Sequence, residues 1–98
     1  NFQLTSIGGL PSGIVDLWIS SGQRKECQFT WDMRRNDNLP TNWGTYKPQC
    51  RFDRVYFRES QPLKVVPGHF GLIGLQRLKP HVCFPSDHWG IICQFKVW

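Results

Sequence analysis

The residues best suited to chemistry lie side by side near the end of the chain, at Ser86, Asp87 and His88. They follow a Pro-Ser turn and precede a stretch, Trp89 to Trp98, in which apolar residues recur at every second position. That period is typical of a β-strand with at least one buried face. An imidazole and a carboxylate would therefore lie where a loop meets a packed strand, which is a rigid place for a titratable pair.

A second carboxylate offers this pair a partner. Residues 51–58 also alternate as a strand does, and Asp53 falls on the face that carries the more apolar side chains of that segment. A carboxylate turned toward a core needs a partner, because an unpaired buried charge is strongly destabilising. The sequence provides two candidates, Arg51 and His88.

Two acids and an imidazole arranged in this way can act on a phosphate ester. Asp53 would accept the proton of one imidazole nitrogen of His88, and the other nitrogen would donate to a non-bridging phosphate oxygen as charge builds there. Such stabilisation is typically worth about 3 kcal/mol per donor. A structural interpretation stays open at this point, in which Asp87 caps a turn and His88 is an ordinary surface residue. A direct Ser86 triad is disfavoured, because neighbouring strand residues point to opposite faces.

Composition limits the class of protein. The chain has 98 residues, an apolar share of 40%, a charged share of 19% and a net charge of +5. These values predict one small folded domain, or part of one, with an anionic partner, nucleic acid before anionic lipid; a plainly solvated surface would carry the same charge. No run approaches the ~20 apolar residues of a membrane span. None of the four cysteines forms a C-x-x-C pair, so we interpret all four as reduced thiols in the nucleus or cytoplasm.

The remaining pattern predicts a thin α/β layer. The expected elements are a helix at 14–19 stopped by Gly22, strands at 27–32, 51–58 and 63–66, a break at Pro67-Gly68, and a long loop at 33–49. So few elements would bury too little apolar area to be stable alone. The chain therefore needs a second half to pack against.

Two motifs carry a family resemblance. The run FPSDHWG at 84–90 resembles the closing S-D-H motif of the endonuclease/exonuclease/phosphatase superfamily, and RFDRVYF at 51–57 resembles its R-x-D-x-[IV] strand. GGLPSGIVDLW at 8–18 and CQFTWD at 27–32 narrow the match to 5′-tyrosyl-DNA phosphodiesterases. The resemblance implies an α/β fold, the C-terminal portion of a four-layer α/β sandwich of the DNase I-like type. Residues 1–98 would then be the C-terminal part of a single catalytic domain.

The resemblance also implies roles for the catalytic group. His88 and Asp87 match the family's catalytic pair, with His88 the transition-state stabiliser or proton donor and Asp87 a supporting acid. Asp53 matches the acid that orients the histidine. Ser86 matches the motif serine and is expected to brace the loop.

Three further positions match the family's DNA channel. Trp31 and Phe52 match aromatic residues that line it, and Leu39 matches an apolar position on the wall that guides the 5′ strand. Stacking on such rings is tolerant of base sequence and is worth about 1–3 kcal/mol per base. For Trp31 the alternative is a core anchor.

The resemblance implies a Mg²⁺-dependent phosphodiesterase, with Mn²⁺ as a substitute, that hydrolyses the 5′-phosphotyrosyl bond between topoisomerase II and DNA in DNA repair. Its expected location is the nucleus, with the cytoplasm second, and its partners are DNA 5′ ends bearing a tyrosyl or peptide adduct, with no membrane. The family's metal ligands are expected upstream of Asn1, so we expect none in this chain. The chain alone would need the rest of the catalytic domain and is predicted to be inactive.

Two alternatives stay open. One is another hydrolase of the same superfamily, such as an abasic-site nuclease or an inositol-polyphosphate phosphatase. The other is a non-catalytic basic module that binds nucleic acid through its aromatic residues.

Overall fold

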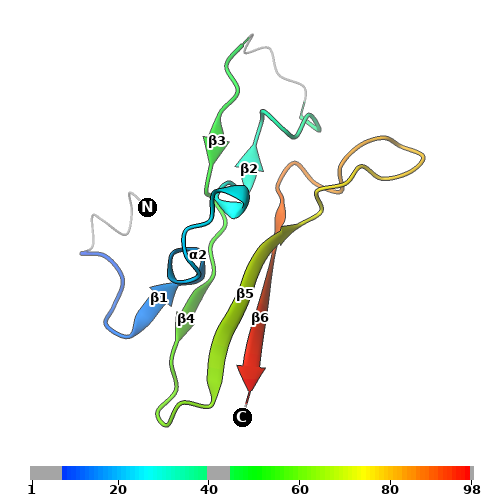
Figure 1. The fold of residues 1–98 in the computed structure, drawn as a ribbon. Helices are drawn as coiled ribbons and strands as arrows, with labels where there is room; N and C mark the ends of the chain where they lie inside the picture. Colours follow the sequence, from blue (N-terminus) through cyan, green and yellow to red (C-terminus); the bar gives the residue numbers. More distant parts are fainter. Residues whose placement is uncertain (1–7, 40–44, 98) are drawn as a thin grey trace.

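The described part of the chain forms three antiparallel strand pairs and two very short helices. The structure, a computed structural model, describes residues 8–39 and 45–97. The elements are β1 (Ile14–Asp16), α2 (Leu17–Ser20), the 3-10 helix η1 (Lys25–Cys27), β2 (Trp31–Asp32), β3 (Gln49–Cys50), β4 (Tyr56–Arg58), β5 (Val65–Ile73) and β6 (Gly90–Val97). In Figure 1 the long β5–β6 hairpin runs beside α2 and β4, β1 lies on the other side of its partner β4, and β2 and β3 lie above them. The whole measures 50 × 35 × 17 Å, which is the thin layer expected.

The β5–β6 hairpin carries the S-D-H motif at its end. Its register runs from Val65 opposite Val97 to Ile73 opposite Gly90, so β6 begins two residues after His88. A Cβ atom on Gly90 would lie 2.8 Å from Cγ1 of Ile73, so a larger residue there would displace the first pair of the ladder. The strand predicted to begin at Trp89 is confirmed over Gly90–Val97.

The predicted break at Pro67-Gly68 is wrong. β5 continues through both residues, and the ladder accommodates them in a register shift between Pro67 and Phe70. Pro67 stays in register opposite Phe95, directly beside this shift, and a proline without an N–H is tolerated next to such an irregularity. Trp98 and residues 40–44 of the predicted loop lie outside the described residues.

The core is small and lies between α2, η1 and the hairpin. Leu17, Cys27 and Phe70 are its buried members, and partly buried side chains pack on it: Trp18, Val55, Phe57, Leu72, Ile91 and Cys93. The outer part of β6 stays uncovered, with Val97 68% exposed. All four cysteines carry free thiols in this structure. The longest helix in the described part of the chain has 4 residues, and none there could cross a membrane.

The predicted helix at 14–19 is wrong in its first half. Ile14–Asp16 form β1 and pair with β4, since β-branched Ile14 and Val15 favour a strand once a partner is present. Asp16 is instead the N-cap of α2, and its Oδ1 accepts a hydrogen bond of 3.1 Å from the backbone N–H of Trp18. Gly22 follows the end of the helix with φ of 113°, which confirms its predicted role as a stop.

Two predicted strands are shorter than expected. The strand predicted at 51–58 is present only as Tyr56–Arg58, and the one predicted at 27–32 only as Trp31–Asp32. Residues 51–55 lie outside the strand ladder and are held by side-chain contacts and by a backbone hydrogen bond of 2.9 Å from the N–H of Leu17 to the carbonyl oxygen of Val55. That difference matters, because Phe52 and Asp53 lie in this segment.

Candidate active site

His88 and Asp53 are in direct contact, although 35 positions separate them in the sequence. Nδ1 of His88 lies 2.5 Å from Oδ2 of Asp53, and the two side chains are 39% and 45% exposed. Arg51, the other partner considered for Asp53, pairs with Asp16 instead. The prediction that Asp53 points into the core is wrong, because residues 51–55 leave the strand conformation and turn this carboxylate toward His88 at the surface.

Thr30 holds both halves of this pair. Its Oγ1 accepts a hydrogen bond of 3.0 Å from the backbone N–H of Asp53. Its carbonyl oxygen accepts one of 2.7 Å from the backbone N–H of Trp89, the residue after His88. Thr30 is only 1% exposed, so these bonds are shielded from water. The sequence did not predict this role for Thr30. The one feature that pointed to Thr30 was its place beside Trp31 in the TWD motif.

The S-D-H loop is braced from two sides. The backbone N–H of His88 donates to Oγ of Ser86 at 3.0 Å, which closes the turn. Nδ2 of the buried Asn36 donates to the carbonyl oxygen of Ser86 at 2.8 Å. The side-chain amide of Asn38 bonds both the N–H and the carbonyl of Phe84, at 2.8 and 2.6 Å. The sequence analysis gave these two asparagines no role, because nothing in the sequence shows which loops meet.

An aromatic row adjoins the dyad. The ring of Phe52 lies 6.3 Å from that of His88 and 5.4 Å from that of Trp31, measured between centroids. Nε1 of Trp31 donates to Oδ2 of Asp87 at 3.3 Å, so Asp87 anchors the end of the row. Phe52 is 59% exposed and free to meet a ligand. Leu39 is also exposed, but in the described part of the chain it makes none of the contacts that join the other predicted residues.

The electrostatics suit Asp53 to accept a hydrogen bond from His88 while it stays ionised. Partial burial raises the pKa of Asp53, but the hydrogen bonds from His88 and Thr30 and the charge of His88 outweigh burial and hold the pKa below its usual value. Asp53 is therefore a carboxylate at neutral pH. A carboxylate only accepts, so Nδ1 of His88 carries the proton in this contact and Nε2 remains for a substrate.

This lowered pKa predicts a pH dependence of stability. The contribution of ionised Asp53 is present above its unfolded pKa of about 3.9 and is lost as pH falls through its lower folded pKa. We expect the free energy of unfolding to fall on acidification below about pH 4 in the native protein, and to fall less steeply in Asp53→Asn. Urea titrations between pH 3 and 6 measure it.

Asp37 provides the control, because its hydrogen bond with Arg77 also lowers its pKa. Asp37→Asn should remove a separate part of the same acid dependence. Identical acid slopes for native protein and Asp53→Asn would show that the dyad does not stabilise the fold.

The described residues do not fit a metal ion on their own. No three His, Cys, Asp or Glu side chains converge in residues 8–39 and 45–97. Mg²⁺ prefers near-octahedral oxygen ligands, and the nearest carboxylates to His88 are engaged with His88 and Trp31. The described residues therefore provide too few free oxygen ligands to bind Mg²⁺ by themselves.

Comparisons with known proteins place this chain beside one group of enzymes in sequence and in fold. No family model matches the chain. Tyrosyl-DNA phosphodiesterase 2 of Homo sapiens is 41% identical over 98 residues, covering 97% of this chain and 25% of the relative. The Danio rerio protein of the same name is 38% identical over 96 residues, covering 95% of this chain and 24% of the relative.

Solved structures show the same likeness in fold. A Danio rerio tyrosyl-DNA phosphodiesterase 2 structure, described as complexed with single-strand DNA product, matches with a TM-score of 0.88 and 37% identity, over 99% of this chain and 38% of that one. The Caenorhabditis elegans structure matches with a TM-score of 0.75 and 38% identity, over 93% of this chain and 26% of that one.

These matches confirm the fold class predicted from the two motifs. The chain spans about a quarter of the length of the curated relatives it matches. In sequence and in fold, the chain is similar to a part of tyrosyl-DNA phosphodiesterase 2.

Proposed function

We propose that the protein containing this chain hydrolyses the 5′-phosphotyrosyl bond between topoisomerase II and DNA, as a nuclear DNA-repair enzyme with the cytoplasm as a second location. The observation that carries the proposal is the His88–Asp53 contact of 2.5 Å beside an exposed aromatic row. The names of the relatives support it. The substrate would be a DNA 5′ end bearing a tyrosyl or peptide adduct.

In this proposal His88 acts on the phosphate. Asp53 fixes the imidazole through Nδ1, and the opposite nitrogen, protonated, donates to a non-bridging oxygen as negative charge builds on it. The leaving group is a tyrosine phenolate with a pKa of about 10, so it needs less help from an acid than a sugar alkoxide would. Asp87, held by Trp31, supports the site as an acid.

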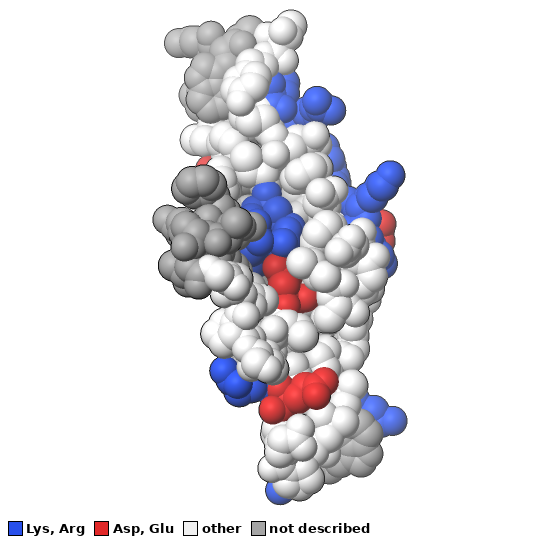
Figure 2. All heavy atoms as spheres, turned by 90° about the vertical axis from the view of Figure 1, so that its left-hand side faces the viewer, with Lys and Arg blue, Asp and Glu red and all other residues white. Residues whose placement is uncertain are grey.

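DNA would meet the aromatic row. On the face shown in Figure 2, Lys and Arg side chains form several separate groups with acidic side chains between them, not one continuous basic stripe. The net charge of +5 still favours DNA over long range. Close contact would then fall to Phe52 and Trp31, with Leu39 guiding the strand.

We predict that Phe52→Ala weakens DNA binding about fivefold to a hundredfold, because it removes a stacking surface worth about 1–3 kcal/mol. Fluorescence anisotropy with a 5′-phosphorylated single-stranded oligonucleotide measures the Kd. Leu63→Ala is the matched control, since Leu63 is also apolar and 49% exposed but lies before the opposite end of the hairpin. Equal Kd values for Phe52→Ala and Leu63→Ala would remove Phe52 from the DNA channel.

Mg²⁺, with Mn²⁺ as a substitute, is part of the proposal. When bound it would neutralise charge on the phosphate. The residues that would hold it lie outside this chain, so the remainder of the catalytic domain is required for activity and the chain alone is expected to be inactive.

The experiment that tests the function compares substrates. The complete protein would be assayed with Mg²⁺ on a 5′-tyrosyl oligonucleotide, an abasic duplex and an inositol polyphosphate. We expect kcat/KM to be highest for the tyrosyl substrate. A higher value for either of the others would place the protein elsewhere in the superfamily, and binding without cleavage of any of them would make it a non-catalytic module.

A further inference from the structure

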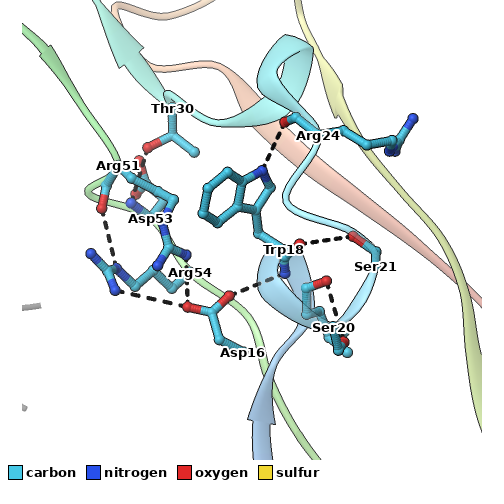
Figure 3. A network of polar contacts seen from close by, with 10 residues as sticks. Asp16, Trp18, Ser20, Ser21, Arg24, Thr30, Arg51, Asp53 and Arg54 are labelled. Atoms are coloured by element: carbon cyan, nitrogen blue, oxygen red, sulfur yellow. Dashed lines mark hydrogen bonds and ion pairs between the residues drawn. The ribbon is translucent and has the colours of Figure 1, made fainter.

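A buried charge cluster adjoins the segment that carries Phe52 and Asp53 (Figure 3). Asp16 is only 4% exposed, and its Oδ2 lies 2.7 Å from Arg51 and 3.8 Å from Arg54. Its other oxygen accepts from the N–H of Trp18 at the start of α2. One carboxylate thus joins the β1–α2 junction to two arginines of a distant segment.

The two arginines bracket the Phe52-Asp53 pair. The guanidinium of Arg51 lies over the ring of Trp18, 4.6 Å from its centroid. Nε of Arg54 donates to the carbonyl oxygen of Arg51 at 3.2 Å, which links the two ends of the segment. β4 begins only at Tyr56, so no strand ladder holds these residues. Their position depends on this link, on the bond from the N–H of Asp53 to Thr30 and on the bond from the N–H of Leu17 to the carbonyl oxygen of Val55.

A buried ion pair contributes little to the stability of the fold at a site such as this one. Burying an ion pair removes both groups from water, and apolar replacements of similar volume are often as stable. An ion pair with a stacked guanidinium does fix the orientation of its partners, because both contacts require a defined geometry. The cluster adjoins Asp53, whose side chain must keep a fixed orientation to stay 2.5 Å from His88.

We propose that Asp16, through Arg51 and Arg54, is a positioning residue that holds Asp53 against His88. The kinetic test of this proposal rests on the proposed function. The positioning of Asp53 against His88 does not depend on which substrate the protein cleaves. Misplacing a group of the site by about 1 Å can lower a rate by about 10²-fold. A small movement of residues 51–54 should therefore lower kcat measurably.

The kinetic test is a double-mutant cycle in the complete protein. Asp16→Asn keeps an oxygen for the Trp18 N–H but removes the charge that binds Arg51. We expect it to lower kcat about tenfold with KM changed less than about twofold, and to lower kcat less than about twofold further in an Asp53→Asn background. A role in general stability would instead produce the same loss in both backgrounds, and that result would overturn the proposal.

The matched control is Glu26→Gln, which breaks the exposed Arg24–Glu26 pair outside the site. Its kcat should equal that of the native protein. Asp16→Glu restores the charge and should recover most of the loss. If Asp16→Asn does not fold, Arg54→Gln replaces it, because the Arg54 contact with Asp16 is longer, at 3.8 Å. The same cycle and the same criteria then apply.

A second readout does not depend on activity. A proton shared between Nδ1 of His88 and Asp53 should appear as a low-field proton NMR resonance, absent in Asp53→Asn. We expect it to broaden or move upfield in Asp16→Asn and to return in Asp16→Glu. An unchanged resonance in folded Asp16→Asn overturns the proposal. If the complete protein does not cleave tyrosyl DNA but the resonance responds, the proposed function fails and the positioning role stands.

Discussion

Replacing His88 with alanine in the complete protein is expected to lower kcat on a 5′-tyrosyl oligonucleotide by about 10³–10⁴-fold. The imidazole is the group that Asp53 holds at 2.5 Å, and its free nitrogen is the donor available for charge on the phosphate. Its loss removes both that donor and the function of Asp53. Single-turnover kinetics with excess enzyme measure the chemical step apart from product release.

His69→Ala is the control for this experiment. His69 is also an exposed histidine, but it lies within β5 rather than beside Asp53. Its variant should keep the native rate. DNA affinity should change little in His88→Ala, because the aromatic row remains. A turnover within about threefold of the native value in His88→Ala would exclude the mechanism proposed above.

Replacing Asp53 with asparagine is expected to lower kcat by about 10²–10³-fold, with a small change in KM. Asparagine keeps the size of the side chain but removes the charge, so Nδ1 of His88 is no longer held as the donor. In a Ser-His-Asp triad the equivalent change acts mainly by selecting the wrong tautomer. Steady-state kinetics on the tyrosyl substrate measure the loss.

The dependence on His88 separates this role from a structural one. If Asp53 acts through His88, the double variant Asp53→Asn/His88→Ala should be no slower than His88→Ala alone. Additive losses would mean that Asp53 acts on the substrate or the fold by another route. Asp37→Asn controls for loss of a carboxylate, because Asp37 pairs with Arg77 at the surface.

The chemistry of the site could be predicted because its residues form short local patterns. Ser86, Asp87 and His88 are consecutive, and the period-2 alternation after them specifies a strand without knowledge of the rest of the chain. The partnership of Asp53 with His88 was one of two open choices, because strand alternation places Asp53 on a face but does not say what lies opposite.

Errors in the predicted elements came from interactions between distant residues. Ile14, Leu17 and Trp18 have an apolar spacing that fits a helix, and only pairing with β4 made Ile14 part of a strand. Pro67 was expected to end a strand, and only the register of β6 accommodates it. Asn36 and Asn38 are unremarkable loop residues until Ser86 and Phe84 lie beside them.

The sequence by itself determined the family resemblance, the fold class, the final strand and the residue types of the site, since each depends on neighbours a few positions apart. Only the tertiary structure decided that Asp53 meets His88 while Arg51 meets Asp16, and that Thr30 and the asparagines hold both loops in place. The physical reason is that a hydrogen bond or ion pair needs its partners within about 3 Å. Whether side chains 35 positions apart in the sequence reach that distance depends on how every intervening segment packs.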